Sequence, residues 1–239
     1  MPAQQINIGG ISVDVEFKDI KNVHLSVYPP TGRVRISAPA RMNLDTIRLY
    51  AIAKLNWIKK QQTKLQSQER ETPREYLDRE SHYLWGKRYL LKVIEADQVP
   101  SVELKHNQMV LTVRPEAVRE RKEDVVAAWY REQLRIVMSP LIAKWEALIS
   151  VKANRIFVQR MKTKWGSCNP RRRSIRLNSE LAKKSPECLE YVIVHELVHL
   201  LEPTHNQRFV ALIDKFMPQW RQFRDELNRQ PLSHAEWEY

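Results

Sequence analysis

The most apolar stretch of this chain carries two histidines and a glutamate at helical spacing. Within the run Tyr191-Val-Ile-Val-His-Glu-Leu-Val-His-Leu-Leu201, His195 and His199 form a His-Glu-x-x-His pattern. On a helix this spacing aims both imidazoles at one point, where neutral rings can bind a zinc ion and Glu196 can act on a water. Because so short a pattern also arises by chance, its surroundings decide how much weight it carries.

The flanking residues predict a buried helix that ends close to a third histidine. Ser185 and Pro186 are typical of a helix N-cap and of the first helical residue. Apart from the motif residues, nearly all residues from Leu189 to Leu201 are apolar. Burying imidazoles and a carboxylate there without partners would cost several kcal/mol. We expect Pro203 to stop the helix, so that the chain turns and returns His205 as a third ligand. Three protein ligands and one open position are typical of a catalytic zinc site.

Other interpretations of these residues stay open from the sequence alone. The two motif histidines could be hydrogen-bonded core residues, with Glu196 as a buried ion-pair partner. The histidine spacing matches the metzincin pattern, but Glu202 occupies the position of the metzincin glycine, so membership of that class does not follow. A fourth protein ligand would make the zinc purely structural. A carboxylate could also replace His205 as the third ligand, and the candidates are Asp214, Asp225 and Glu226.

The pattern of apolar residues changes near residue 115 and predicts two regions, 1–115 and 116–239. The first region is expected to be β-rich with one helix from about Leu44 to Gln66, followed by a polar link or helix extension from Ser67 to Ser81. The second begins with about thirty helical residues from Glu116, which Pro140 is expected to kink or divide. The expected strands are Ile11–Phe17, Val23–Tyr28, Val34–Ser37, Tyr89–Ile94, Val102–Lys105, Met109–Val113, Ile156–Gln159 and Ile175–Leu177. Turns are expected at residues 29–32 and 106–108.

Two blocks of the chain carry a likeness to a known family. One is Met161-Lys-Thr-Lys-Trp-Gly-Ser-Cys168 followed by Ser174-Ile-Arg-Leu-Asn178, and the other runs from Tyr191 to Phe209. In these blocks, and more weakly in its N-terminal segment, the chain resembles the YgjP-like metallopeptidases, small bacterial zincins related to the WLM and SprT-like proteases. The resemblance implies an α+β fold in which residues 116–239 form a zincin-like catalytic domain behind an N-terminal β-rich region.

The same resemblance implies a set of site residues. Zinc ligands are implied at His195, His199 and His205, with Glu196 as the general base. The sequence departs from the expected pattern at Thr204 and Asn206, which flank the third ligand where relatives are expected to carry Asn and a small Ser or Asp. The resemblance does not explain residues 67–115.

These features together predict a zinc-dependent peptidase. Glu196 would accept a proton from the attacking water and pass it to the leaving amine. A donor near the zinc would help to stabilise the oxyanion, and the candidates are Lys164, Tyr191 and Arg160. Because an edge strand commonly lines the cleft of a zincin, the strand formed by Ile175, Arg176 and Leu177 is the expected partner of an extended substrate.

The charge of the chain supports a competing hypothesis. The net charge is +12, and nine Lys or Arg residues but no Asp or Glu lie between Lys152 and Ser179. This stretch, which includes Arg171, Arg172 and Arg173, could be a solvated loop, a rim that favours acidic peptides, or a surface for nucleic-acid phosphates. The alternative function is therefore a basic nucleic-acid-associated protein in which the zincin site is secondary or inactive.

The remaining features concern the cellular compartment in which the protein is expected. No apolar run approaches the ~20 residues that a membrane-spanning helix needs, and the start of the chain lacks the basic and apolar regions of a secretory signal. Cys168 and Cys188 are the two cysteines, too few for a disulfide framework, and both are expected to be packing residues. We expect a cytoplasmic protein without a membrane partner.

Overall fold

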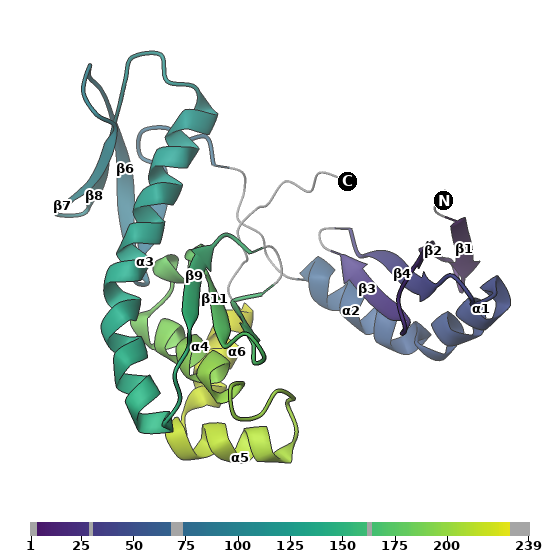
Figure 1. The fold of residues 1–239 in the computed structure, drawn as a ribbon. Helices are drawn as coiled ribbons and strands as arrows, with labels where there is room; N and C mark the ends of the chain where they lie inside the picture. Colours follow the sequence, from purple (N-terminus) through teal and green to yellow (C-terminus); the bar gives the residue numbers. More distant parts are fainter. Residues whose placement is uncertain (1–3, 29–30, 68–73, 162–163, 230–239) are drawn as a thin grey trace. The chain divides into compact units, whose positions relative to one another are not determined.

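The computed structural model describes residues 4–28, 31–67, 74–161 and 164–229 of the chain (Figure 1). The expected turn at 29–32 and the expected link at 67–81 fall partly outside these residues. The chain divides into two compact units, Met1–Glu69 and Arg70–Tyr239, and each unit has its own hydrophobic core. The sequence suggests a division near residue 115, whereas the structure groups the strands of residues 81–113 with the second unit, because their apolar side chains share its core.

The first unit is a four-stranded sheet with two helices packed against it. Its elements are β1 (Gln4–Ile8), β2 (Ile11–Lys18), β3 (His24–Tyr28), β4 (Arg33–Pro39), α1 (Leu44–Ala53) and α2 (Leu55–Ser67). The strand order is β1-β2-β4-β3, with β2 and β4 parallel. Alternating residues such as Val13 and Val15 are fully buried, as expected for strands with one face on a core. The single expected helix is interrupted at Lys54, which caps α1 at its C-terminus.

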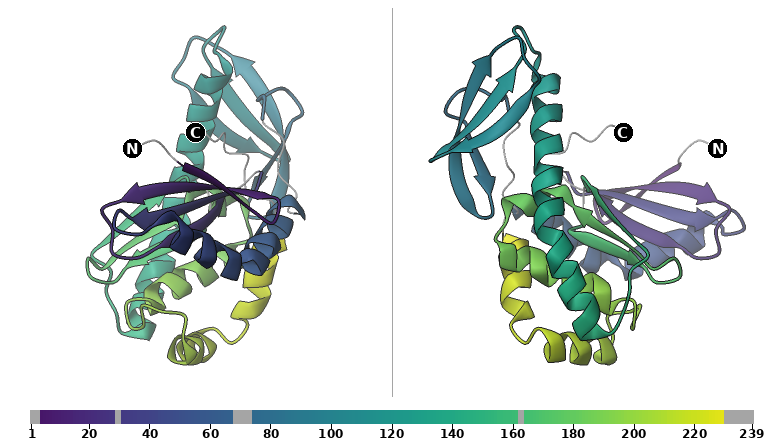
Figure 2. Two further views of the ribbon diagram at one scale, coloured as in Figure 1. Left: turned by 90° about the vertical axis from the view of Figure 1, so that its right-hand side faces the viewer. Right: turned by 60° about the vertical axis from the view of Figure 1, so that its left-hand side comes forward.

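The second unit begins with another four-stranded sheet that packs on a long helix. The strands are β5 (Ser81–Leu84), β6 (Lys87–Glu95), β7 (Ser101–Lys105) and β8 (Gln108–Val113), in the order β5-β6-β8-β7. The long helix is α3 (Arg119–Ile149), and the sheet lies beside its N-terminal half in Figures 1 and 2. Pro140 does not divide α3 as the sequence suggested. Pro140 is exposed, so water can satisfy the carbonyl that loses its hydrogen bond there.

A three-stranded sheet and three helices lie along the C-terminal half of α3 (Figure 2). The elements are β9 (Arg155–Gln159), β10 (Gly166–Asn169), β11 (Ser174–Asn178), the 3-10 helix η1 (Ser179–Lys183), α4 (Pro186–Val198), α5 (Gln207–Phe216) and α6 (Trp220–Arg229). The strand order is β10-β11-β9, with β11 antiparallel to β10 and parallel to β9. Within the described residues, no helix combines the length and the apolar character needed to cross a bilayer.

A matched pair of substitutions on α3 tests this packing. Leu134 is fully buried in the core of the second unit, whereas the side chain of Ile136 on the same helix is 59% exposed. Leu134→Ala should lower the free energy of unfolding by about 2–5 kcal/mol, because it leaves a cavity in the core. Ile136→Ala should change it by no more than about 0.5 kcal/mol. Urea unfolding followed by tryptophan fluorescence measures both, since six of the seven tryptophans belong to this unit. Equal losses in the two variants would contradict the assigned helix face.

Candidate active site

The motif helix α4 begins as the sequence predicts but ends earlier. Ser185 is its N-cap and accepts a hydrogen bond from the backbone N–H of Cys188, and Pro186 is its first residue. The helix ends at Val198 rather than at Pro203, because the chain tightens into a turn after the second motif histidine. The N–H of Leu200 donates to the carbonyl of residue 197 at 3.0 Å, a bond across three residues instead of four. The chain can therefore change direction within one helical turn after His199.

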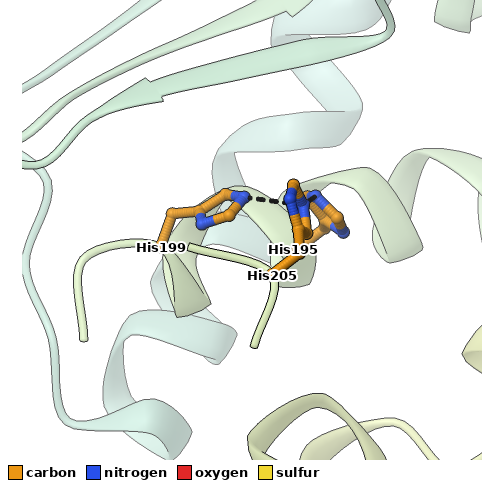
Figure 3. A group of neighbouring side chains, drawn as sticks. All are labelled: His195, His199 and His205. Carbon is orange, nitrogen blue, oxygen red and sulfur yellow. Dashed lines mark hydrogen bonds between the residues drawn. The ribbon is translucent and has the colours of Figure 1, made fainter. Parts of the chain in front are cut away.

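This turn brings the three histidines together (Figure 3). The Nε2 atom of His205 lies 3.0 Å from Nε2 of His195 and 3.2 Å from Nε2 of His199. Three nitrogen ligands at the usual Zn–N distance in a tetrahedral arrangement are about 3.3 Å apart. The two distances to His205 therefore match those of a metal-binding set, and the ligand atoms of all three histidines lie within 4.8 Å of one another. Among the described residues, this is the one group of three or more His, Cys, Asp or Glu side chains close enough to share an ion.

Hydrogen bonding and burial favour the form of His195 and His199 that binds a metal. Nδ1 of His199 lies 3.0 Å from the carbonyl oxygen of Glu202. Because a carbonyl can only accept, Nδ1 carries the hydrogen and the lone pair is left on Nε2. Burial, with smaller contributions from the neighbouring His199 and His205, lowers the pKa of His195 to about 3, and burial also lowers the pKa of His199. Nδ1 of His195 is buried without a hydrogen-bond partner among the described residues, so this ring too is held neutral.

The residues around His205 fix the third imidazole against the helix. The ring of Phe209 is 2% exposed and lies 5.0, 4.6 and 4.7 Å from the ring centroids of His195, His199 and His205, so all three pack on it. Asn206 caps α5 by accepting from the N–H of Phe209 at 3.0 Å.

The turn that carries His205 does not depend on a glycine. Thr204 donates to the carboxylate of Glu202 at 3.0 Å. Among the described residues 199–205 none has a positive φ, so the metzincin glycine that this chain lacks is not needed here.

Glu196 lies against a strand that comes unusually close to α4. A Cβ atom placed on Gly166 of β10 would lie 2.6 Å from Oε1 of Glu196 and 2.8 Å from its Cγ, so only a glycine leaves room for this carboxylate. Burial raises the pKa of Glu196 to about 8, and the positive charge of Lys164 partly opposes this shift. From the sequence alone no role is assigned to Gly166 itself, although a glycine inside a strand is a sign of close approach by another group.

A cleft of about 380 Å³ opens beside these residues. It is lined by residues 164–168 and Pro170, by one side of α4 between Tyr191 and Glu196, by His199, by the turn at Pro203 and His205, and by α6. Of the three expected oxyanion donors, Lys164 and Tyr191 line this cleft. Arg160 does not, and its Nη1 forms an ion pair with Glu123 at 2.7 Å instead.

A buried asparagine positions the segment that carries Lys164. Asn178 is fully buried at the end of β11, and its Nδ2 donates to the carbonyls of Met161 and Lys164, both at 2.8 Å. Its Oδ1 accepts from the N–H of Met161 at 3.2 Å. Lys162 and Thr163 of the same block lie outside the described residues. Asn178 therefore fixes where the chain re-enters the cleft before β10.

The carboxylates considered as alternative third ligands are engaged elsewhere. Asp214 accepts from Nε1 of Trp220 at 2.7 Å and from Nη1 of Arg221 at 2.5 Å. Asp225 is bound by Arg224 at 3.0 Å. Neither these two nor Glu226 lies in the group formed by the motif histidines, so the geometry favours His205.

The strand expected to bind substrate needs correction. Ile175, Arg176 and Leu177 belong to β11, which is the central strand of its sheet. Each of the three is paired with β10 on one side and with β9 on the other, so their backbone groups are not free to pair with a peptide. The strand at the edge of the sheet beside the cleft is β10. A pattern of apolar residues locates a strand but does not show whether it is central or at an edge.

The two cysteines are packing residues, as expected. Cys188 is fully buried in α4, and Cys168 lines the cleft on β10. Neither forms a disulfide. Burial raises the pKa of both thiols to about 11, and both are therefore protonated near neutral pH.

Comparison with known proteins decides the family. A sequence model for the family described as YgjP-like, metallopeptidase domain, matches residues 21–230. The chain belongs to this YgjP-like family. The match runs through most of both units and includes the histidine triad, and the expected α+β fold with N-terminal strands is confirmed. Membership supports a peptidase, which acts on peptide substrates and, as a metallopeptidase, uses a metal ion. It gives no support to a nucleic-acid partner.

Solved structures add a partial likeness. The metallopeptidase zymogen abylysin of Pyrococcus abyssi is 19% identical, with a TM-score of 0.35 over 39% of this chain and 97% of that one. The metallopeptidase zymogen jannalysin of Methanocaldococcus jannaschii is also 19% identical, with a TM-score of 0.34 over 37% of this chain and 90% of that one. No curated protein matches the chain. Its function is therefore inferred from its family and from its own site.

The buried carboxyl group makes a testable contribution to stability. In protein kept metal-free with a chelator, folded Glu196 keeps its proton up to a pH of about 8, whereas the unfolded chain loses it near the usual pKa of 4.5. The folded state thus binds the extra proton, and the free energy of unfolding falls as the pH rises through this window. Between pH 7 and pH 9 the free energy of unfolding should fall by about 1 kcal/mol more in the wild type than in Glu196→Gln. The cysteines titrate in both proteins and cancel in this comparison. Parallel curves in urea unfolding would contradict the raised pKa.

Proposed function

We propose that this protein is a zinc-dependent metallopeptidase whose metal is held by His195, His199 and His205. The observation that supports this most strongly is the convergence of three Nε2 atoms at 3.0 and 3.2 Å beside a buried carboxylate. Three imidazole nitrogen ligands suit zinc, and no fourth protein ligand lies in the group among the described residues, so one position stays open for catalysis. A purely structural zinc would need that fourth ligand.

Zinc bound to these histidines would supply Lewis acidity, which polarises a carbonyl and lowers the pKa of a water. Glu196 follows directly after the first ligand on α4, and its carboxylate faces the cleft beside Gly166. A cation held by the histidines would favour the ionised form of Glu196. The carboxylate would then take a proton from the attacking water and deliver this proton to the nitrogen of the leaving amine. Because Glu196 is almost fully buried, little bulk water competes for that proton.

Two side chains are placed to stabilise negative charge on the scissile carbonyl oxygen. Lys164 is close enough to Glu196 for its charge to lower the pKa of that carboxyl group. Tyr191 lies one helical turn before His195, and its ring stacks on Trp220 at 6.3 Å. Burial raises the pKa of Tyr191 to about 12, so its hydroxyl keeps the hydrogen that an oxyanion would accept. We assign the oxyanion contact to these two residues and not to Arg160.

The substrate pairs with β10 rather than with β11. Among the described strands of its sheet, β10 pairs only with β11, which leaves the backbone groups of its other edge available. The cleft follows β10 from Lys164 to Pro170, and Gly166 lies beside Glu196. A peptide added along this edge would be held by main-chain hydrogen bonds with its scissile bond near the general base.

The ligand assignment can be tested by metal analysis. His205→Ala should lose most of its zinc under conditions where the wild type holds about one ion per chain, because two nitrogen ligands remain of three. Asp214→Ala is the matched control, since this neighbouring carboxylate contacts Trp220 and Arg221 instead of the histidines. Mass spectrometry of the native proteins and competition with a zinc-binding dye measure occupancy and affinity. Zinc loss in Asp214→Ala with retention in His205→Ala would reverse the assignment.

The general base can be separated from the ligands by a second substitution. Glu196→Gln should keep its zinc and its melting temperature, because the side chain remains similar in size and is not a ligand. Hydrolysis of a peptide substrate should fall by at least about a hundredfold, the lower end of general acid–base contributions. Unchanged turnover would exclude Glu196 as the base. Loss of zinc together with activity would show that it supports the ligands.

A further inference from the structure

The turn that follows β10 carries two guanidinium groups without partners. Arg171 and Arg172 are both exposed, and neither side chain forms a hydrogen bond or ion pair with a residue that the structure describes. The backbone of the turn is nevertheless held in place, because the N–H of Arg172 donates to Oδ1 of Asn169 at 3.0 Å and the N–H of Arg173 donates to the carbonyl of Pro170 at 3.2 Å. Two exposed charges thus lie on a turn whose backbone is held by hydrogen bonds.

Other cations of the basic stretch are already engaged. Four of them contact groups of the same unit. Lys152 pairs with Glu146 at 2.6 Å, and Arg160 pairs with Glu123 at 2.7 Å. Nε of Arg173 donates to the carbonyl of Lys152 at 2.7 Å, and the guanidinium of Arg176 lies 5.7 Å from the ring centroid of Phe157. The broad basic surface that the sequence suggests is therefore reduced. Lys164 places one charge in the cleft beside Glu196, and Arg171 and Arg172 place two more at the end of β10.

The position of this pair relative to the general base is set by β10. Gly166 lies beside Glu196, and the cleft continues along the strand as far as Pro170. At about 3.3 Å per residue, β10 spans roughly 10 Å from Gly166 to Asn169, and Arg171 follows two residues later in the turn. An extended peptide paired with the edge of β10 would therefore reach the two arginines about four or five residues from its scissile bond.

The charges inside the cleft fit the same kind of ligand. Among the described residues that line it, Glu196 is the one acidic side chain. Arg224 also lines the cleft, but its Nε and Nη2 contact the carboxylate of Asp225 at 3.1 and 3.0 Å, so its charge is largely offset. Selectivity for charge should therefore come from the far end of β10 rather than from α6.

We propose that the substrate is an acidic segment in extended conformation, paired with the edge of β10, with carboxylate side chains facing Arg171 and Arg172. This inference rests on the proposed function, because Glu196 and the histidines define where the scissile bond lies. A strand edge offers backbone hydrogen bonds that a peptide can complete and a nucleic acid cannot. Two free arginines would also give a nucleic acid only about two phosphate contacts, too few for tight binding at physiological salt.

Binding to an inactive enzyme tests the inference without hydrolysis. The probe is full-length, zinc-loaded Glu196→Gln with fluorescein-labelled peptides of about eight residues, which span β10 and its turn. One set carries an Asp-Asp pair at one end or the other, and matched sets carry Ser-Ser or Lys-Lys. Fluorescence anisotropy should show about tenfold tighter binding for one placement of Asp-Asp than for Ser-Ser at low salt, and a smaller difference at 0.5 M salt. Adding Arg171→Ala and Arg172→Ala should remove the preference.

The control is Lys105→Ala with Arg114→Ala, which removes two exposed cations from the β5–β8 sheet, with side-chain exposures of 61% and 71%. Equal affinity for the Asp-Asp and Ser-Ser peptides, or an equal loss in the control, would overturn the inference. So would duplex DNA that binds more tightly than the acidic peptides and is released by the Arg171 and Arg172 substitutions.

An acidic preference in binding without hydrolysis by the wild type would reject the proposed function alone. Hydrolysis with the same kcat/KM for acidic and neutral peptides would reject this inference alone.

Discussion

The burial of α4 is the constraint on which the site depends. This helix passes through the core of the second unit, yet it carries His195 and Glu196 among its apolar residues and has His199 as its C-cap. Taking these groups out of water disfavours their charged forms, which lowers the pKa of both imidazoles and raises that of the carboxyl group. Neutral imidazoles are the form that a divalent cation binds, so burial that would be costly in isolation prepares a metal site. Phe209 completes this arrangement because all three imidazoles pack on it.

The close approach of β10 to this helix follows from the same burial. The carboxylate of Glu196 needs space between α4 and β10, and Gly166 leaves this space because it has no side chain. Gly166 has no positive φ, so the requirement at this position is for space and not for an unusual backbone. A larger residue would displace either Glu196 or the strand. The glycine therefore couples the chemistry of α4 to the strand along which a substrate would lie.

Local patterns predicted much of this structure, and long-range pairing accounts for most of what they missed. The N-cap at Ser185, the return of His205 and the long helix α3 follow from neighbouring residues, which a sequence displays directly. The central position of β11 depends on partners in other segments, so its apolar pattern could not show it. The strand β10 was missed because Gly166-Ser-Cys-Asn169 lacks strong β-formers. The boundary between units was misplaced because a core shared by α3 and the β5–β8 sheet is a property of contacts, not of composition.

The charges of the second unit fall into two zones that act on different steps. Glu196 and His199 are largely shielded from water, so electrostatic interactions of these two groups are strong and little screened by salt. At Arg171 and Arg172 the side chains are exposed, and the field of each is screened within about 10 Å at 0.1 M salt. An interaction in the first zone changes as bonds form and break, and therefore affects kcat. An interaction in the second is the same in the bound substrate and the transition state, so it alters KM without changing kcat. Substitutions at Arg171 and Arg172 can therefore change substrate selectivity without changing the chemistry at Glu196, because only the backbone of β10 connects the two places.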